Sequence, residues 1–273
     1  MSYILIYLAT GFSSLVTNGR QGERLFLFLA LAFFAAWIGL RYYTGCDYGS
    51  YYLRFLTYEN TSFSEYLNAR ITAPSSYFTE ELGFVALNYA IIKVGLSFDW
   101  LNIISAIIYM LGIFFFLRRR ENTLALLTLF IPLLMIQLGM SGIRQALALG
   151  FMMLAYNAFT DRRPILVGFW ILIASQFHFS SLFFAPMMLL VFGNVTVIRF
   201  AFVVGITIPF AYFFGGDRLD LYQTRYIEND LGSEGAVFRV TITALTALFF
   251  ELNKRTFQQI FPRDYPLMRL SHS

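Results

Sequence analysis

The sequence predicts an all-α integral membrane protein with about eight to ten transmembrane or re-entrant helices. Of its 273 residues, 58% are hydrophobic and only 13% are charged, and the mean hydropathy is +0.63. Soluble domains carry roughly a quarter charged residues, and a soluble fold of this length has too little interior to bury so much apolar surface. The bilayer must therefore be part of the solvent, where helices satisfy their own backbone polar groups.

Charge and cysteine content exclude several other classes of protein. The net charge is +4, but the basic residues lie mainly in short connectors between apolar runs, and no nucleic-acid-binding motif is present. The single cysteine, Cys46, leaves no intramolecular disulfide and no cysteine-based metal cluster. The chain has two histidines, His178 and one in the terminal tail. A single histidine without further ligands makes no metal site. We therefore expect no metal, no cofactor and no nucleic-acid partner.

The apolar runs predict the helices in order. They cover residues 3–16, 25–40, 82–96, 101–117, 124–140, 143–159, 165–177, 182–192, 200–214 and 237–250. The first run lacks a preceding basic segment and a clear cleavage site, which favours a retained span over a removed signal peptide. Several runs are too short to cross upright, so we expect tilted, broken or re-entrant helices. One membrane-embedded domain is expected over residues 1–255, followed by a short polar tail over residues 256–273.

Lysines and arginines in short connectors predict the orientation, because they are enriched on the cytoplasmic side. The cytoplasmic connectors are then those at residues 20–24, 118–120, 162–163 and 254–255. The segments at residues 41–81, 139–144, 176–181 and 215–235 fall outside. Two full crossings between Asp47 and Arg118 would place both on one side. Run 82–96 is therefore predicted to be re-entrant or merged with the helix that follows it.

The outer segment at residues 41–81 is too long for a simple connector, and loops of this length often carry function. Its polar and aromatic residues recur at helical spacing, which predicts an interfacial helix lying on the outer leaflet. One face of that helix carries Asp47, Tyr51, Arg54 and Tyr58, and an adjacent face carries Tyr48, Tyr52 and Phe55.

Polar residues at the outward ends of the runs are the candidates for chemistry. Arg41 ends run 25–40 and is suited to a phosphate, while Asp47 could accept a proton from a sugar hydroxyl or hold Arg41. The alternative is an ordinary helix end, with Arg41 snorkelling and Asp47 capping the next helix. Glu80 and Glu81 precede an apolar run, and the alternative to catalysis is the favourable placement of acids at a helix N-terminus.

Two further clusters lie near helix ends. Arg144 begins a run on the outer side, against the usual bias of arginine, and its donors add to the free amides of the helix start to suit a pyrophosphate. The alternative is a loop charge at the interface. His178 ends a run and is suited to act as a base, a phosphate partner or a helix cap. The outer loop with Arg225 mixes charges and aromatic rings, as sugar-facing loops and plain solvated loops both do.

The order of these motifs resembles the EpsG family, which is related to the Wzy polymerases of bacterial surface polysaccharides. The resemblance runs over most of residues 25–254, and against it the chain is expected to be short at the C-terminus. It rests on Arg41…Gly45-Cys46-Asp47-Tyr48…Tyr51, Glu81-Leu82-Gly83-Phe84, Ile143-Arg144-Gln145-Ala146-Leu147-Ala148, Phe177-His178-Phe179-Ser180-Ser181-Leu182 and Tyr222…Tyr226.

The resemblance implies a GT-C-like membrane glycosyltransferase. It would pass a polyprenyl-diphosphate-linked glycan to a hydroxyl of another lipid-linked repeat unit, at the periplasmic or extracellular face of the bacterial plasma membrane. Its partners would be that lipid-linked oligosaccharide, membrane lipids, and a chain-length regulator and a flippase. For this reaction, the expected base is His178 first and Asp47 or Glu81 second, and the expected pyrophosphate- and substrate-binding residues are Arg41, Arg144, Gln145, Arg225, Tyr48 and Tyr51.

Two other functions stay open. A transporter or flippase of lipid-linked sugars would also bind pyrophosphate through arginines, but it would carry polar groups through the midplane. Here the middle of each run is nearly free of charge, which favours an interfacial enzyme. A non-catalytic subunit of a synthesis complex is the third possibility. The enzyme hypothesis requires Arg41, Asp47, Arg144 and His178 to converge in one pocket.

Overall fold

The computed structural model describes residues 20–45, 47–72, 80–120, 123–191, 196, 198–209, 241, 244–245, 248–249 and 251–260. Every regular element in this part of the chain is helical, which confirms the predicted all-α class. The fold divides into two compact units, Met1–Leu182 and Phe183–Ser273. The single membrane domain expected over residues 1–255 spans both units and stays a prediction.

The helices of the first unit follow the apolar runs of the sequence. They are α2 (Arg20–Gly39), α3 (Tyr48–Glu59), α4 (Phe63–Thr72), α5 (Leu82–Lys93), α6 (Phe98–Leu117), α7 (Thr123–Phe130), the π-helix η1 (Ile131–Leu138), α8 (Gly139–Ser141), α9 (Ile143–Thr160) and α10 (Pro164–Ser175). The 3₁₀ helix η2 (Phe179–Val191) begins in this unit and ends in the second. In the second unit, helices cover Ile198–Pro209 and α13 (Lys254–Ile260).

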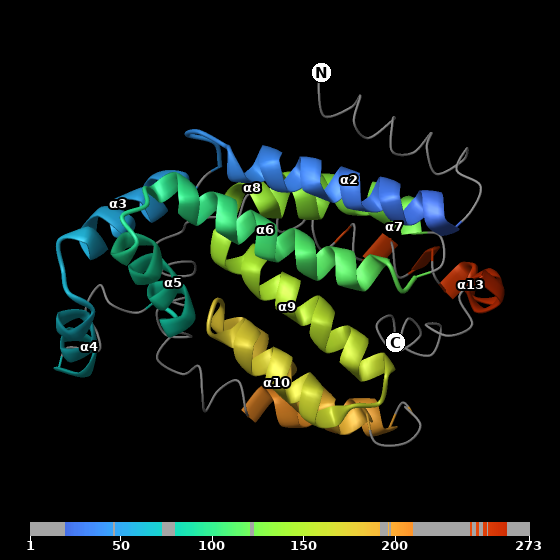
Figure 1. Ribbon diagram of the computed structural model, residues 1–273. Helices are drawn as coiled ribbons and strands as arrows, with labels where there is room; N and C mark the ends of the chain where they lie inside the picture. Colours follow the sequence, from blue (N-terminus) through green and yellow to red (C-terminus); the bar gives the residue numbers. More distant parts are fainter. Residues whose placement is uncertain are drawn as a thin grey trace. The chain divides into compact units, whose positions relative to one another are not determined.

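The first unit is a helix bundle in which α6 lies between α2 and α9, and α9 lies between α6 and α10 (Figure 1). Small residues allow the backbones to come close, as in other membrane helix pairs. A Cβ added at Gly112 of α6 would lie 2.6 Å from the Cα of Gly150 in α9. A Cβ at Gly39 of α2 would lie 2.9 Å from the Cα of Ile103 in α6.

Three helical segments among the described residues are long and apolar enough to cross a membrane: Gly22–Gly39, Phe98–Leu117 and Thr123–Ser141. Four shorter apolar helices accompany them, at Leu82–Lys93, Pro164–Ser175, Phe179–Val191 and Ile198–Pro209. These helices do not confirm the predicted count of eight to ten spans. Large apolar side chains on the outside, such as Phe28, Leu129 and Leu172, are at least half exposed, as lipid-facing side chains would be.

Two predictions for the connecting segments need adjustment. The run predicted at 82–96 forms α5 by itself, because the chain turns at Gly95 with a positive φ of 76° before α6 begins. It is therefore not merged with α6, and twelve helical residues span only about 18 Å. The helix predicted from the spacing of Asp47 to Tyr58 forms as α3, and a second helix that was not predicted, α4, follows it in the same segment.

Several other predictions fall where the structure describes little or nothing. Run 3–16 lies outside the described residues, as do most of run 237–250 and the loop at residues 215–235. In the predicted polar tail, α13 continues to Ile260, and residues 261–273 lie outside the described part.

Candidate functional site

Contacts gather several helix ends at one end of the first unit, which we call the site end. Arg41, just after α2, donates through Nη1 to the carbonyl of Gly139 at 2.6 Å and through Nη2 to Asn102 Oδ1 of α6 at 3.2 Å. Glu81, before α5, contacts both the first turn of α9 and the start of η2. The segments at residues 41–81, 139–144 and 176–181, which the sequence grouped together, thus meet.

Glu81 is the residue that joins these elements. Its Oε2 accepts a hydrogen bond from Arg144 Nη1 at 2.9 Å, and its Oε1 accepts one from the backbone N–H of Phe179 at 3.1 Å. The residue is 5% exposed. Since each carboxylate oxygen holds a donor, the arrangement supports a positioning role for Glu81 better than the role of a base.

The backbone around Glu81 explains why only certain residues fit there. Glu81 is extended (φ −67°, ψ 133°) and precedes the first turn of α5. The N–H of Phe84 donates to the carbonyl of Gln176 at 3.1 Å. A Cβ at Gly83 would lie 2.7 Å from the Cβ of Gln176, so glycine is needed for α5 to approach the end of α10.

Glu80 forms a second, adjoining network. It is 2% exposed, and its carboxylate contacts the guanidinium of Arg54 and the hydroxyl of Tyr58, both from α3. Its backbone carbonyl accepts a hydrogen bond from Arg70 of α4. Arg144 Nη1 lies 3.9 Å from Glu80 Oε1, which links the two networks.

Arg144, the arginine bound to Glu81, is partly accessible. Its side chain is 24% exposed, and its guanidinium carbon lies 5.8 Å from the ring centroid of Tyr51 and 6.0 Å from that of Phe84. Both distances are compatible with cation–π attraction. Gln145 is exposed, and its Oε1 lies beside Gly142 at the start of α9. A partly accessible guanidinium at the N-terminus of a helix is suited to an anion.

Arg41 occupies a different environment. It is 6% exposed, and its hydrogen bonds brace the end of α2 against α6 and the start of α8. Burial lowers the pKa of Arg41, against the opposing effects of Tyr51, Tyr48 and Asp47. Asp47 itself is exposed, and its carbonyl accepts the N–H of Tyr51 at 3.0 Å in the first turn of α3. These contacts favour a bracing role for Arg41 over direct binding of pyrophosphate.

Tyr48 and Tyr51 lie in the core rather than on an accessible surface. Each is 5% exposed; Tyr48 packs edge-on against Phe98, with ring centroids 5.3 Å apart, and Tyr51 packs against Phe84 at 5.7 Å. Stacking on a sugar would require either ring to leave this packing. The exposed tyrosines of the same region are Tyr42, Tyr43 and Tyr52.

His178 is half-buried in the turn between α10 and η2. The backbone N–H of His178 donates to the carbonyl of Ala174 at 3.0 Å. The backbone N–H of the next residue, Phe179, donates to Glu81. Of the four residues expected to converge, Arg144 is thus joined through Glu81 to the backbone of Phe179, the residue that follows His178. Arg41 and Asp47 lie in neighbouring segments of the site end, and Arg225 lies outside the described residues.

The networks contain residues that the sequence did not single out for the site. Arg54 and Tyr58 had appeared only as one face of a predicted helix, and Arg70 not at all. Their spacing of four residues in α3 does place Arg54 and Tyr58 on one face, and Glu80 is the nearest acid in sequence to Glu81. The sequence does not show that Glu80 meets Arg54 and Tyr58 of α3.

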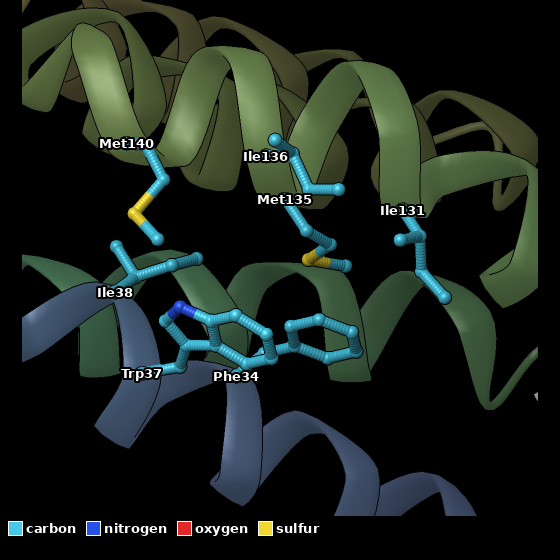
Figure 2. Close-up of a pocket in the computed structure, with 7 residues that line it drawn as sticks. All are labelled: Phe34, Trp37, Ile38, Ile131, Met135, Ile136 and Met140. Carbon is cyan, nitrogen blue, oxygen red and sulfur yellow. The ribbon is translucent and has the colours of Figure 1, made fainter. Parts of the chain in front are cut away.

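An apolar hollow elsewhere in the first unit has no such chemistry. It lies between α2 and the η1–α8 segment, where Phe34 and Trp37 face Met135 and Met140 (Figure 2). Its lining is hydrophobic and carries no titratable group. Among the described residues there is also no cluster of histidine, cysteine and acidic side chains of the kind that holds a metal.

Apolar outer faces with buried acids and arginines at one end of a helix bundle define a membrane protein with a polar site at its helix ends. The sequence model of the EpsG family matches residues 24–268, and the chain belongs to this family. Searches of curated proteins and of solved structures found no match.

Proposed function

We propose that this EpsG-family chain is a polysaccharide polymerase of the bacterial plasma membrane. It transfers a glycan from a polyprenyl diphosphate to a hydroxyl of another lipid-linked repeat unit, on the outer face of the membrane. The observation that carries this proposal is the pair of Glu81 and Arg144, in which a buried carboxylate holds a partly exposed guanidinium at the start of α9.

The chemistry requires a fixed positive charge and an acceptor for a proton. The bond between the anomeric carbon and the diphosphate oxygen breaks, and the acceptor hydroxyl forms the new glycosidic bond. Arg144 and the free amides of α9 stabilise the negative charge that develops on the departing polyprenyl diphosphate. The hydroxyl proton passes to a base, for which His178 is the first candidate because Glu81 holds the next residue.

The rest of the site supports this assignment through positioning. Glu81 joins Arg144 to the backbone of Phe179, so the segment that carries His178 is held next to the start of α9. Gln145, exposed one residue after Arg144, is suited to contact the same substrate. A chain-length regulator and a flippase are the protein partners that such a polymerase would need.

The experiment uses purified protein and lipid-linked repeat units, with product length followed on a gel. The wild type should produce a ladder of polymers, and Arg144→Gln should reduce the rate of chain growth by about a hundredfold or more, as removal of a transition-state donor does. Arg119→Gln, which removes an arginine paired with Asp161 at the other end of the bundle, is the matched control and should leave the ladder unchanged.

Other outcomes would identify the other functions. Movement of the lipid-linked repeat across vesicles without chain growth would establish a transporter. Chain growth that needs a second protein and is indifferent to Arg144→Gln would establish a non-catalytic subunit. Either result would overturn the proposed polymerase activity of this chain.

A further inference from the structure

Arg54 is a charged side chain of the site end for which the proposed reaction has assigned no role. It projects from α3, and its side chain is 44% exposed, whereas the carboxylate of Glu80 that it contacts is 3% exposed. Tyr58, one turn further along α3, donates to the other oxygen of Glu80. Glu80 therefore anchors the tip of Arg54 while much of the arginine stays accessible.

Arg54 and Arg144 approach the same atom from two helices far apart in sequence. The Nη1 of Arg54 contacts Glu80 Oε1, and the Nη1 of Arg144 lies 3.9 Å from that same oxygen. Arg144 is at the same time bound to Glu81 at 2.9 Å. The two guanidiniums thus lie side by side, each fixed by a buried acid, on side chains that are 44% and 24% exposed.

The local charge leaves an excess of cations. Among the described residues in contact here, three guanidiniums accompany two carboxylates. Arg54 and Arg144 contact the carboxylate oxygens of Glu80 and Glu81, and Arg70 donates to the backbone carbonyl of Glu80. Burial lowers the pKa of Arg54, and the positive charge of Arg144 lowers it further, so the two cations repel each other where they meet. An anion placed between them would relieve this repulsion.

We propose that Arg54 is a second diphosphate-binding residue, which with Arg144 forms a two-armed clamp on the lipid donor. This inference rests on the proposed function and refines it. Each guanidinium takes one phosphate, because a planar fork of donors matches phosphate oxygens. Glu80 positions Arg54 toward Arg144, and Tyr58 fixes Glu80. A clamp of two cations selects a diphosphate over a monophosphate, since the second phosphate is what engages the second arm.

Binding of defined lipids to the purified chain tests the clamp. The probes are a short-chain polyprenyl diphosphate and the matching monophosphate, titrated in detergent at fixed salt. Wild type should bind the diphosphate more tightly than the monophosphate. Arg54→Gln should weaken diphosphate binding about tenfold, as expected for the loss of one charge-assisted contact, and should change monophosphate binding much less. Arg54→Lys keeps the positive charge but lacks the planar fork of donors. Its affinity for the diphosphate should lie between those of the wild type and Arg54→Gln.

The control is matched in exposure and pairing. Arg119 is 43% exposed and bound to an acid, like Arg54, but at the opposite end of the bundle. Arg119→Gln should leave both affinities unchanged. In polymerisation assays Arg54→Gln should raise the KM for the lipid donor more than it lowers kcat, a change that a loss of folding alone does not produce. If Arg54→Gln does not fold, Arg54→Lys supplies the same comparison.

The outcomes separate the clamp from the proposed reaction. Chain growth that is lost in Arg144→Gln but keeps its donor KM and its diphosphate preference in Arg54→Gln would overturn the clamp and leave the polymerase standing. A wild type that neither binds the diphosphate nor extends chains would overturn the polymerase, and the clamp with it. Equal binding of the two lipids by wild type would overturn selection of a diphosphate by the clamp.

Discussion

The two ends of the first unit treat their charged residues in opposite ways. At the site end, the carboxylates of Glu80 and Glu81 are 3% and 4% exposed, and their partners come from other helices. At the opposite end, Arg119 binds Asp161 at 2.6 Å with side chains 43% and 26% exposed. Burial of a carboxylate costs free energy unless its partners are well placed, whereas exposed pairs form and break with little consequence.

The aromatic residues differ between the ends as well. At the opposite end the guanidinium carbon of Arg118 lies 4.7 Å from the ring centroid of Phe115, and that of Arg120 lies 4.5 Å from that of Phe116. These arginines cover rings at the edge of the bundle, as snorkelling side chains do. At the site end the rings of Tyr51 and Phe84 are themselves buried, and Arg144 lies beyond them. At the site end the charge of Arg144 is held in place by a buried acid, whereas the arginines of the opposite end cover rings at the edge of the bundle.

The largest expected effect comes from breaking the buried pair. Glu81→Ala leaves Arg144 without its closest acid and releases the N–H of Phe179. We expect a loss of about 3 kcal/mol in the free energy of unfolding, at the lower end for a broken buried pair because Arg144 is partly exposed. Asp161→Asn at the opposite end should cost at most about 1 kcal/mol. Unfolding in detergent measures both, and equal losses would contradict the comparison.

The part of this contrast that could be predicted from the sequence is the part that depends on apolar runs and on charged connectors. Helices α2, α6 and α9 followed from long apolar runs, and the shared location of residues 41–81, 139–144 and 176–181 followed from the basic connectors. Arg144 was chosen because arginine on the outer side is unusual. These inferences use patterns that are local in sequence or summed over whole connectors.

The remainder depended on side-chain geometry that no local pattern records. Tyr48 and Tyr51 are of the residue type that stacks on sugars, and their rings pack in a buried cluster with Phe84 and Phe98. Arg41 is hydrogen-bonded to Gly139 and Asn102, two partners that the sequence does not reveal. The pairing of Arg54 with Glu80 joins residues far apart in sequence, and no local pattern predicts it.

A second, smaller effect tests whether the site end depends on close backbone packing. Gly83→Ala would place a methyl group 2.7 Å from Gln176 Cβ and 2.8 Å from its carbonyl oxygen, so α5 must move away from α10. We expect about 1–3 kcal/mol of destabilisation, as for other overpacked positions, together with reduced chain growth as Glu81 shifts.

The control for this substitution is Gly22, in the first turn of α2. A methyl group added at Gly22 meets no atom within 4 Å, and alanine favours a helix more than glycine does. Gly22→Ala should therefore leave unfolding unchanged or slightly raise its free energy, with normal chain growth. If Gly83→Ala behaved like Gly22→Ala in both assays, the close approach of α5 to Gln176 would be unimportant for the site.

The smallest effect isolates one hydrogen bond within the buried network. Tyr58→Phe removes the hydroxyl that Glu80 accepts but keeps the ring, which packs against Tyr66 with centroids 5.6 Å apart. Because Arg54 still contacts Glu80, we expect a loss of only about 1 kcal/mol, the net contribution of a typical hydrogen bond.

Tyr89→Phe is the comparison for that hydrogen bond, since its hydroxyl makes an exposed contact of 3.4 Å to the carbonyl of Ser62. It should change the free energy of unfolding by less than about 0.5 kcal/mol, as surface substitutions do. Tyr58→Phe should also weaken binding of the lipid diphosphate, because Glu80 then holds Arg54 less firmly, and Tyr89→Phe should not. If the two variants bound the diphosphate equally well, Glu80 would matter for packing alone and the contrast between the ends would be one of burial rather than of function.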